Sequence, residues 1–319
     1  MKSIGVLTSG GDAPGMNAAV RAVVRSAIAN GFKVYGILDG YNGLINNEVK
    51  EMDRNSVSNI INRGGTVIYT ARCPEFKDQA GVRKGKETCE KLGIEGLVVI
   101  GGDGSFRGAA DLSSMGIPCV GIPGTIDNDI TCTDYTIGYD TAMNTVVEMV
   151  DKLRDTCDSH NRCSVVEVMG RRCGDLALNA GIACGATAII VPEIPFDFNK
   201  DILNKIEEAQ NAGKHHYIII VAEGVGGSQE IAKKIEEVTG IESRAAILAH
   251  VQRGGSPTAK DRIVATRMGD YAVNLLKHRI GNRVIALKGN DIVDFDIHEA
   301  LKMKKSIDKE LFDIADKVR

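Results

Sequence analysis

Short apolar segments alternate with amphipathic helical segments along almost the whole chain, and this alternation limits the folds available to it. The helix expected to begin near Met16 has an apolar stripe that includes Val20, Val24 and Ala27. Gly31 follows as its C-terminal cap. We expect strands at residues 4–8, 34–38, 96–100, 118–122, 164–168, 188–191, 217–222, 245–249 and 284–287. Further helices are expected at residues 141–158, 201–211, 229–238 and 259–277. This order predicts parallel sheets covered by helices on both faces.

Segments rich in glycine or charged residues follow six of these strands. They are residues 10–12, 101–105, 124–129, 169–171, 223–224 and 250–253. Ligands of open parallel sheets bind at the carboxyl ends of the strands, so these segments are expected to form one functional site.

Length and composition exclude several other classes of protein. A chain of 319 residues predicts two domains. The net charge of −3, the absence of tryptophan and the 4% aromatic content do not favour nucleic-acid binding. No apolar run is long enough to span a bilayer, and Met1 and Lys2 lead directly into a strand rather than a signal peptide. The eight cysteines have no C-x-x-C spacing, which argues against zinc and disulfides and favours a reducing cytoplasm.

Two glycine loops resemble phosphate-binding loops. Residues 9–15 read SGGDAPG and open a helix, where free N–H groups favour an anion. Residues 101–105 read GGDGS, and Asp103 is suited to Mg²⁺. The alternatives are a tight turn for the first loop and a capping aspartate for the second. Neither loop has the P-loop or the G-x-G-x-x-G spacing, which makes NAD binding a weak interpretation.

A third loop, PGTIDND at residues 123–129, carries two carboxylates. If the loop is extended, Asp127 and Asp129 project the same way, so that one acts as a base while the other tunes the metal or the local field. The alternative is a surface turn with two aspartates. Together with the glycine loops, these carboxylates predict phosphoryl transfer.

Arginines in or beside loops suggest an anionic substrate, because guanidinium groups pair well with phosphate oxygens. They are Arg72, Arg162, Arg171, Arg244 and Arg253. Arg21 and Arg25 lie four residues apart on the first helix and predict either a second anion site or a solvated face. His250 has no apparent triad partner, so we expect it to bind substrate rather than act in nucleophilic catalysis.

The motifs LTSGGDAPGMNAA, YTARCPEF, GGDGS, GIPGTIDND, GYDTA, VEVMGR, VAEGVG and HVQRGGSPTA, in this order, closely resemble those of bacterial ATP-dependent 6-phosphofructokinases. The resemblance covers essentially the whole chain. It implies two Rossmann-like three-layer α/β/α domains with mostly parallel sheets and an active site in the cleft between them. Residues 1–138 with about 252–304 would bind ATP, and about 139–251 with 305–319 would bind fructose 6-phosphate. It also implies a cytoplasmic homotetramer that performs the committed step of glycolysis.

The resemblance assigns roles to individual residues. The ATP site would comprise Gly11, Arg72, Cys73, Gly102, Asp103, Gly104 and Ser105, with Asp103 on Mg²⁺. The catalytic residues would be Asp127 as the base for the 1-hydroxyl proton, Thr125 and Arg171 on the transferred phosphoryl group, and Asp129 near the metal. Besides Thr125, Asp127 and Arg171, the sugar phosphate would contact Ile126, Met169, Gly170, Glu223, His250, Val251, Gln252 and Arg253, and also Arg162 and Arg244 of a neighbouring subunit.

The phosphoryl donor is indicated by two glycines. Pyrophosphate-dependent relatives typically have Asp at the position of Gly104 and Lys at that of Gly124. Glycine at both positions leaves room for the α-phosphate of ATP. A pyrophosphate-dependent enzyme and a non-catalytic sugar-phosphate or nucleotide sensor on the same fold are the alternatives.

An effector site for ADP or phosphoenolpyruvate is also implied. It would comprise Arg21, Arg25, Arg54, Arg154, Gly185, Lys214, His215 and His216. Two positions depart from the family pattern. Thr187 replaces a glutamate that holds the effector's Mg²⁺, and Ala212 replaces a basic residue. We therefore expect anion binding with weak or altered activation by ADP.

Overall fold

The computed structural model describes residues 1–319 as two compact units. Unit 1 comprises Met1–Thr125, Ile130–Thr141 and Arg253–Lys305. Unit 2 comprises Ile126–Asp129, Ala142–Gln252 and Ser306–Arg319. No helix is long and apolar enough to cross a membrane.

Unit 1 is built on a seven-stranded sheet with the order β11-β10-β5-β4-β1-β2-β3. Its strands are β1 (Ser3–Ser9), β2 (Lys33–Ile37), β3 (Val49–Met52), β4 (Leu97–Gly101), β5 (Cys119–Pro123), β10 (Arg283–Lys288) and β11 (Asp291–Asp296). The inner strands β2, β1, β4, β5 and β10 pair in parallel, and β4 and β5 are buried along their whole length. Burial on both faces explains why these segments are continuously apolar.

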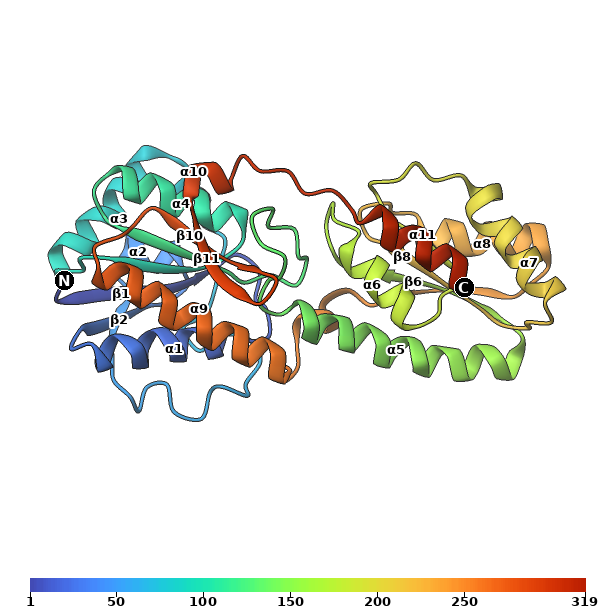
Figure 1. Ribbon diagram of the computed structural model, residues 1–319, viewed down its shortest axis with the longest axis horizontal. Coiled ribbons are helices and arrows are strands. Elements are labelled where there is room, and N and C mark those ends of the chain that lie inside the picture. The colour runs from blue at the N-terminus through green and yellow to red at the C-terminus, as the bar shows by residue number, and fades with distance from the viewer. The chain divides into compact units, whose positions relative to one another are not determined.

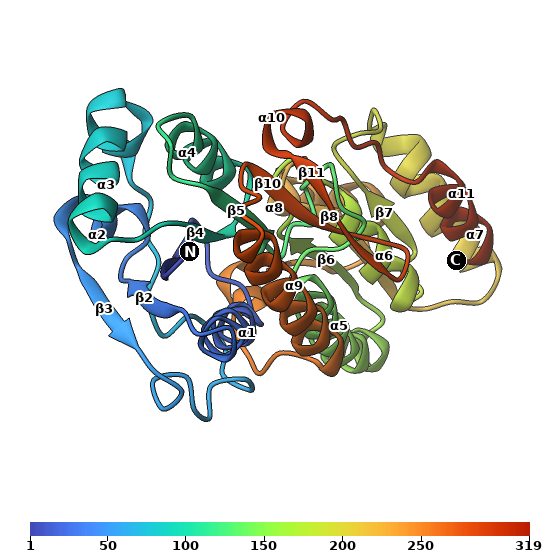
Figure 2. The same cartoon turned by 60° about the vertical axis from the view of Figure 1, so that its left-hand side comes forward.

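Helices cover both faces of this sheet (Figures 1 and 2). On one face, α1 (Met16–Ala29) packs against α9 (Ala259–Lys277). On the other lie α2 (Tyr41–Asn46), η1 (Pro74–Lys77), α3 (Gln79–Leu92), α4 (Asp103–Ser114) and α10 (Ile297–Ala300). Asn30 is the C-cap of α1, and Gly31 follows it with a positive φ of 79°, as expected of the C′ residue.

Unit 2 has a four-stranded parallel sheet with the order β7-β8-β6-β9. The strands are β6 (Cys163–Val168), β7 (Ala188–Ile190), β8 (Tyr217–Ala222) and β9 (Ser243–Ile247). One face packs on α5 (Tyr139–His160), α6 (Asp175–Ala183) and α11 (Lys309–Val318). The other packs on the π-helical turn η2 (Asn199–Leu203), α7 (Asn204–Asn211) and α8 (Ser228–Thr239). The prediction of parallel sheets between helical layers is confirmed in both units.

The structure differs from the sequence prediction in three places. The strands β3 and β11 were not expected, and both pair antiparallel at the edges of the unit 1 sheet. The strand predicted at 245–249 ends at Ile247, because Ala249 has a left-handed φ of 47° and begins the 3₁₀ turn η3 (Ala249–Arg253). Residues 126–129 group with unit 2, whereas the predicted division placed them in the first domain, since Asn128 Nδ2 donates to Asp175 of α6 at 2.7 Å.

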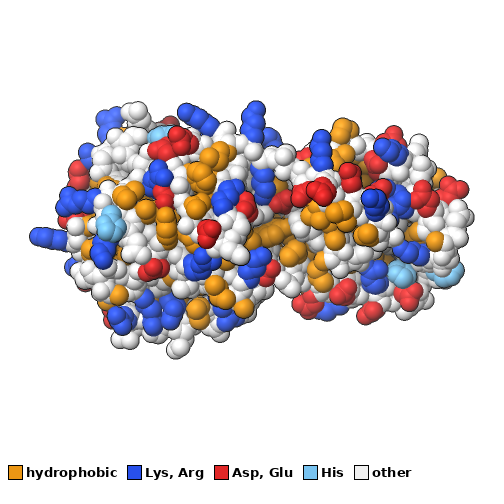
Figure 3. Space-filling view, in the orientation of Figure 1, with side chains coloured by type: hydrophobic (Ala, Val, Ile, Leu, Met, Phe, Trp, Pro, Cys, Tyr) orange, Lys and Arg blue, Asp and Glu red, His pale blue; other side chains and the backbone are white.

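Charge is evenly mixed on the face drawn in Figure 3, where acidic and basic side chains alternate over both units. No large area of one sign is visible there. This distribution agrees with the small net charge of −3.

The close packing of β5 against α4 generates a stability prediction. A Cβ added at Gly121 would lie 2.6 Å from Cε1 of the buried Phe106 ring. We expect Gly121→Ala to lower the free energy of unfolding by about 1–3 kcal/mol, because the ring has no space to move. Chemical denaturation measures this change.

Gly104→Ala is the matched control, since an added Cβ there meets no atom within 4 Å and lies in the first turn of α4. We expect no loss of stability in that variant. Equal stability of wild type and Gly121→Ala would contradict the packing argument.

Candidate active site

The two predicted phosphate loops lie at the ends of neighbouring strands of unit 1. Residues 9–15 follow β1, with Gly10 and Gly15 at positive φ values of 91° and 103°. The GGDGS loop is shorter than expected, since α4 already begins at Asp103. The hydroxyl of Ser105 donates to the carbonyl of Ser9 at 3.1 Å. Ser105 therefore joins the two loops, a role that its predicted place in the ATP site did not include.

Asp103 and Gly104 form the exposed part of this turn. Asp103 is half-buried at the N-terminal end of α4, where the helix dipole favours negative charge. Gly104 is exposed, with open space where a Cβ would stand. No group of three or more His, Cys, Asp or Glu side chains is arranged to hold a metal ion. The half-buried Asp103 carboxylate, beside the exposed Gly104, suits Mg²⁺ coordination by a single carboxylate together with phosphate oxygens of a nucleotide.

Gly124 differs from Gly104 in its surroundings. A Cβ at Gly124 would lie 3.1 Å from Ile100 Cγ2 and 3.2 Å from Met16 Cε. Packing within unit 1 therefore already favours glycine at this position, whereas nothing in the fold requires it at Gly104.

Two other predicted ATP-site residues, Arg72 and Cys73, lie directly before η1. Arg72 is exposed, and the half-buried Cys73 precedes η1, where burial raises the pKa of its thiol. Arg253, predicted to hold the sugar 6-phosphate, donates through Nη1 to the carbonyl of Asp12 at 3.0 Å and packs on Gly11. The structure thus places Arg253 on the 9–15 loop of unit 1.

In unit 2, both predicted carboxylates face one guanidinium group. Arg171 Nε lies 3.3 Å from Asp127 Oδ2, and Arg171 Nη1 lies 3.9 Å from Asp129 Oδ2. Asp127 is 1% exposed and Asp129 is 26% exposed, while Arg171 is half in solvent. The loop is not extended, because Asn128 between the two carboxylates is left-handed with φ of 49°. The carboxylates nevertheless converge on Arg171.

The backbone of Arg171 is held in an unusual conformation by its neighbours. Its φ is 55°, and Glu223 Oε1 accepts hydrogen bonds from the N–H groups of Gly170 and Arg171 at 3.2 and 2.6 Å. Gly224 is needed below this turn, since a Cβ there would collide with the Arg171 carbonyl. Glu223, predicted to bind sugar, therefore also fixes the turn that carries Arg171.

Gln252 has a comparable supporting role. Its side chain is fully buried, accepts a hydrogen bond from Met169 N at 3.1 Å and donates to the Ala249 carbonyl at 3.0 Å. His250 and Val251 beside it are exposed, whereas Ile126 is fully buried. Of these predicted substrate contacts, only His250 and Val251 present their side chains to solvent.

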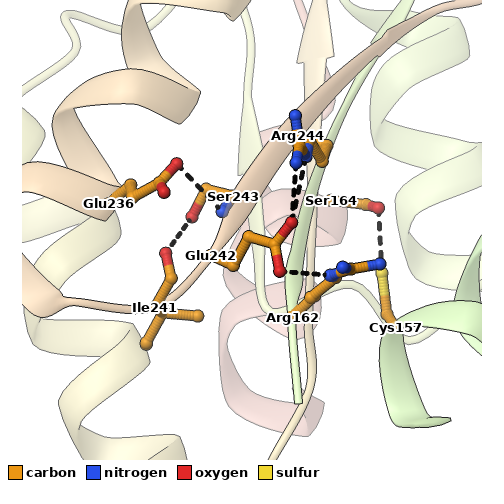
Figure 4. A network of polar contacts seen from close by, with 8 residues as sticks. All are labelled: Cys157, Arg162, Ser164, Glu236, Ile241, Glu242, Ser243 and Arg244. Carbon is orange, nitrogen blue, oxygen red and sulfur yellow. Dashed lines mark hydrogen bonds and ion pairs between the residues drawn. The ribbon is translucent and has the colours of Figure 1, made fainter. Parts of the chain in front are cut away.

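The predicted 6-phosphate arginines Arg162 and Arg244 are joined by one carboxylate (Figure 4). Glu242 Oε2 lies 2.7 Å from Arg162 Nε, and Glu242 Oε1 lies 2.7 Å from Arg244 Nη2. These hydrogen bonds, first that of Arg162, lower the pKa of Glu242. Glu242 was not predicted from the sequence. Its position directly before Ser243 and Arg244, at the start of a strand, could have indicated a contact with Arg244.

The predicted effector residues fall into two groups. In unit 1, burial and the neighbouring charge of Arg25 lower the pKa of Arg21, and the buried Nε of Arg25 has no hydrogen-bond partner. Arg54 is exposed.

The second group lies in unit 2. Arg154 donates to the carbonyl of Cys184, which directly precedes Gly185. His216 Nδ1 lies 2.8 Å from Asp158 Oδ1. Lys214 and His215 are exposed. Thr187 is 6% exposed, and its hydroxyl accepts from Ile218 N at 3.3 Å.

The glycine loops and the helix N-terminal carboxylate of unit 1, and separately the carboxylate pair facing an arginine in unit 2, are features typical of phosphotransferases with α/β folds. Comparison with known proteins agrees with this class. The family model "Phosphofructokinase" matches residues 3–276, so the chain belongs to the phosphofructokinase family.

Similar proteins carry related names. The chain is 59% identical to "ATP-dependent 6-phosphofructokinase 1" of Clostridium perfringens over 318 residues, covering 100% of this chain and 99% of that protein. It is 56% identical to an ATP-dependent 6-phosphofructokinase of Alkaliphilus metalliredigens, covering 99% and 98%. The phosphofructokinase of Saccharomyces cerevisiae superposes with a TM-score of 0.89 at 38% identity, covering 95% of this chain and 45% of that longer chain. A pyrophosphate-dependent phosphofructokinase from Marinobacter aquaeolei has a TM-score of 0.87 at 21% identity, which shows the shared fold alone.

Proposed function

We propose that this protein transfers the γ-phosphoryl group of ATP to the 1-hydroxyl of fructose 6-phosphate, giving fructose 1,6-bisphosphate and ADP. The observation that carries this proposal is the pair formed by the buried Asp127 and Arg171, in a chain of the phosphofructokinase family. Unit 1 binds the nucleotide, with Asp103 as the protein ligand of Mg²⁺. Bound Mg²⁺ would offset the negative charge of the phosphates.

Asp127 accepts the proton of the 1-hydroxyl as its oxygen attacks the γ-phosphorus and the bond to the leaving ADP oxygen breaks. Arg171 and Thr125 steady the transferred phosphoryl group, and Asp129 supports the local field. Arg171 places a positive charge beside the Asp127 carboxylate, with Nε 3.3 Å from Oδ2. The remaining sugar contacts are those assigned to unit 2, with Glu223 and Gln252 holding the Met169–Arg171 turn.

We further propose that the active form is a homotetramer in which Arg162 and Arg244 reach the sugar 6-phosphate of a neighbouring subunit. The Glu242 bridge supports this assignment, because it keeps together the guanidinium groups of Arg162, directly before β6, and of Arg244 on the adjacent strand β9. Each arginine retains further N–H donors for a phosphate.

Gly104 favours ATP as the donor, because no packing contact in the fold requires glycine at this position. We expect wild type to form fructose 1,6-bisphosphate with ATP and not with pyrophosphate. Gly104→Asp should raise the KM for ATP at least about tenfold, because a carboxylate would stand in the space of the α-phosphate. The variant should still fold, because an acidic residue is favourable in the first turn of α4.

A coupled assay with each donor measures these rates, and Gly104→Ala separates the effect of bulk from that of charge. Turnover of wild type with pyrophosphate alone would favour the pyrophosphate-dependent class. No turnover with either donor, together with sugar-phosphate binding, would favour a sensor.

The assigned base is tested by Asp127→Ser. We expect kcat to fall by roughly 10²–10⁴-fold while the affinity for fructose 6-phosphate stays within about threefold, since the proton acceptor is lost and the other sugar contacts remain. Steady-state kinetics and calorimetry measure the two quantities. Asp313→Ser, an exposed aspartate of the same unit, is the matched control. Wild-type turnover in Asp127→Ser would reject the assignment.

We propose that regulation by nucleoside diphosphate is weak in this chain. The unpartnered Nε of Arg25 supports an anion site, but Thr187 offers no carboxylate to a metal and its hydroxyl already bonds to β8. We expect phosphoenolpyruvate to inhibit and ADP to activate little, as measured by initial rates against fructose 6-phosphate with each effector. Mg²⁺-dependent activation by micromolar ADP would contradict this proposal.

A further inference from the structure

A fully buried carboxylate outside the assigned site organises the turn that follows β5. Asp261 lies in the first turn of α9 and is 0% exposed. Its Oδ1 accepts from the hydroxyl of Tyr135 at 2.6 Å and from Gly138 N at 2.7 Å. Its Oδ2 accepts from Thr141 N at 3.0 Å and from the Thr141 hydroxyl at 2.5 Å. All four partners are therefore in residues 135–141.

Asp261 accepts all four hydrogen bonds, an arrangement that suits an ionised carboxylate. The two backbone groups can only donate, and the Thr141 hydroxyl, which also accepts from Thr258 N at 3.0 Å, donates to Asp261 Oδ2. Burial raises the pKa of Asp261, and the hydrogen bonds from Thr141 and Tyr135 oppose that rise. Two helix N-termini also stabilise the negative charge, because Asp261 lies in the first turn of α9 and Thr141 in that of α5.

The segment that Asp261 holds is bonded in turn to Thr125. The N–H of Thr125 donates to the Ile137 carbonyl at 3.1 Å, and the fully buried Thr136 hydroxyl donates to the Thr125 carbonyl at 2.6 Å. Ile137 N also donates to the Pro123 carbonyl at 2.9 Å. Thr136 and Ile137 thus fix the carbonyl and the N–H group of Thr125. The next residue along the chain, Gly138, is bonded to Asp261.

The same segment packs on the 9–15 loop. A Cβ at Gly138 would lie 2.7 Å from the Ala13 Cβ, and one at Gly15 would lie 2.6 Å from Ile137 Cγ2. Residues 136–138 are therefore enclosed between the 9–15 loop, Thr125 and Asp261. The segment therefore cannot shift unless one of these neighbours also moves.

We propose that Asp261 is a positioning residue, whose carboxylate holds residues 135–141 and through them sets the backbone of Thr125 for phosphoryl transfer. This inference rests on the proposed function only for the role of Thr125. Because the reaction depends on placement of the transferred group, loss of the carboxylate lowers kcat more than it weakens substrate binding.

The test compares three full-length variants with wild type. Asp261→Asn keeps the shape of the side chain but turns an NH₂ group toward two donors. Tyr135→Phe removes one donor and leaves three, which keeps the test informative if Asp261→Asn fails to fold. Thr258→Ala is the matched control, because it removes only the side-chain acceptor of Asp261 N at the N-terminus of α9 and leaves all four carboxylate contacts in place.

We expect kcat to fall about 10–100-fold in Asp261→Asn and several-fold in Tyr135→Phe, with KM values changed less than about threefold. In both variants the Thr125 amide should exchange its hydrogen faster than in wild type. Thr258→Ala should lower the melting temperature without changing kcat or that exchange rate.

Wild-type kcat and Thr125 exchange in Tyr135→Phe or in folded Asp261→Asn would overturn the proposal. A kcat loss in Thr258→Ala as large as that in Asp261→Asn would also overturn it, because stability alone would then explain the effect. If wild type itself fails to phosphorylate fructose 6-phosphate, the proposed function fails, and the exchange rate of Thr125 still tests the positioning by Asp261.

Discussion

The ion pair between Arg171 and the buried Asp127 is the interaction on which the candidate site depends. It requires a left-handed Arg171, and that conformation needs the Glu223 carboxylate on its N–H and the absence of a side chain at Gly224. The pair matters because Asp127 is only 1% exposed, and a buried carboxylate that carries a charge requires a compensating charge. The turn of unit 2 that carries Arg171 is therefore fixed by its neighbours rather than by local preference.

Unit 1 stabilises its irregular backbone in another way. Side chains from other segments hold its glycine loops, since Thr70 donates to the Gly10 carbonyl and Arg253 to that of Asp12. Ser105 ties the loop after β4 to the end of β1, and Asp261 ties residues 135–141 to the start of α9. In both units, polar side chains that bond to backbone N–H or carbonyl groups thus stabilise the irregular backbone.

The inner strands were predictable because burial on both faces demands continuous apolar runs, as in β8. The edge strand β11 was not, since DIVDFD mixes charge with apolar residues. Asp103, Asp127 and Arg171 were found from motif and resemblance. Glu242, Asp261 and the support given by Gln252 were not, because their partners lie far along the chain or depend on an unforeseen turn. The sequence likewise did not show that a side chain would be crowded by unit 1 atoms at Gly124 and would meet none at Gly104.

The central claim is that this phosphofructokinase-family protein moves a phosphoryl group from ATP to a sugar phosphate. Phosphorus NMR of the purified protein with Mg²⁺, ATP and fructose 6-phosphate tests it most directly. We expect the γ-phosphorus signal of ATP to disappear while ADP and a second sugar phosphomonoester appear in equal amounts. Unchanged ATP, or ADP formed with inorganic phosphate and no second phosphomonoester, would contradict it.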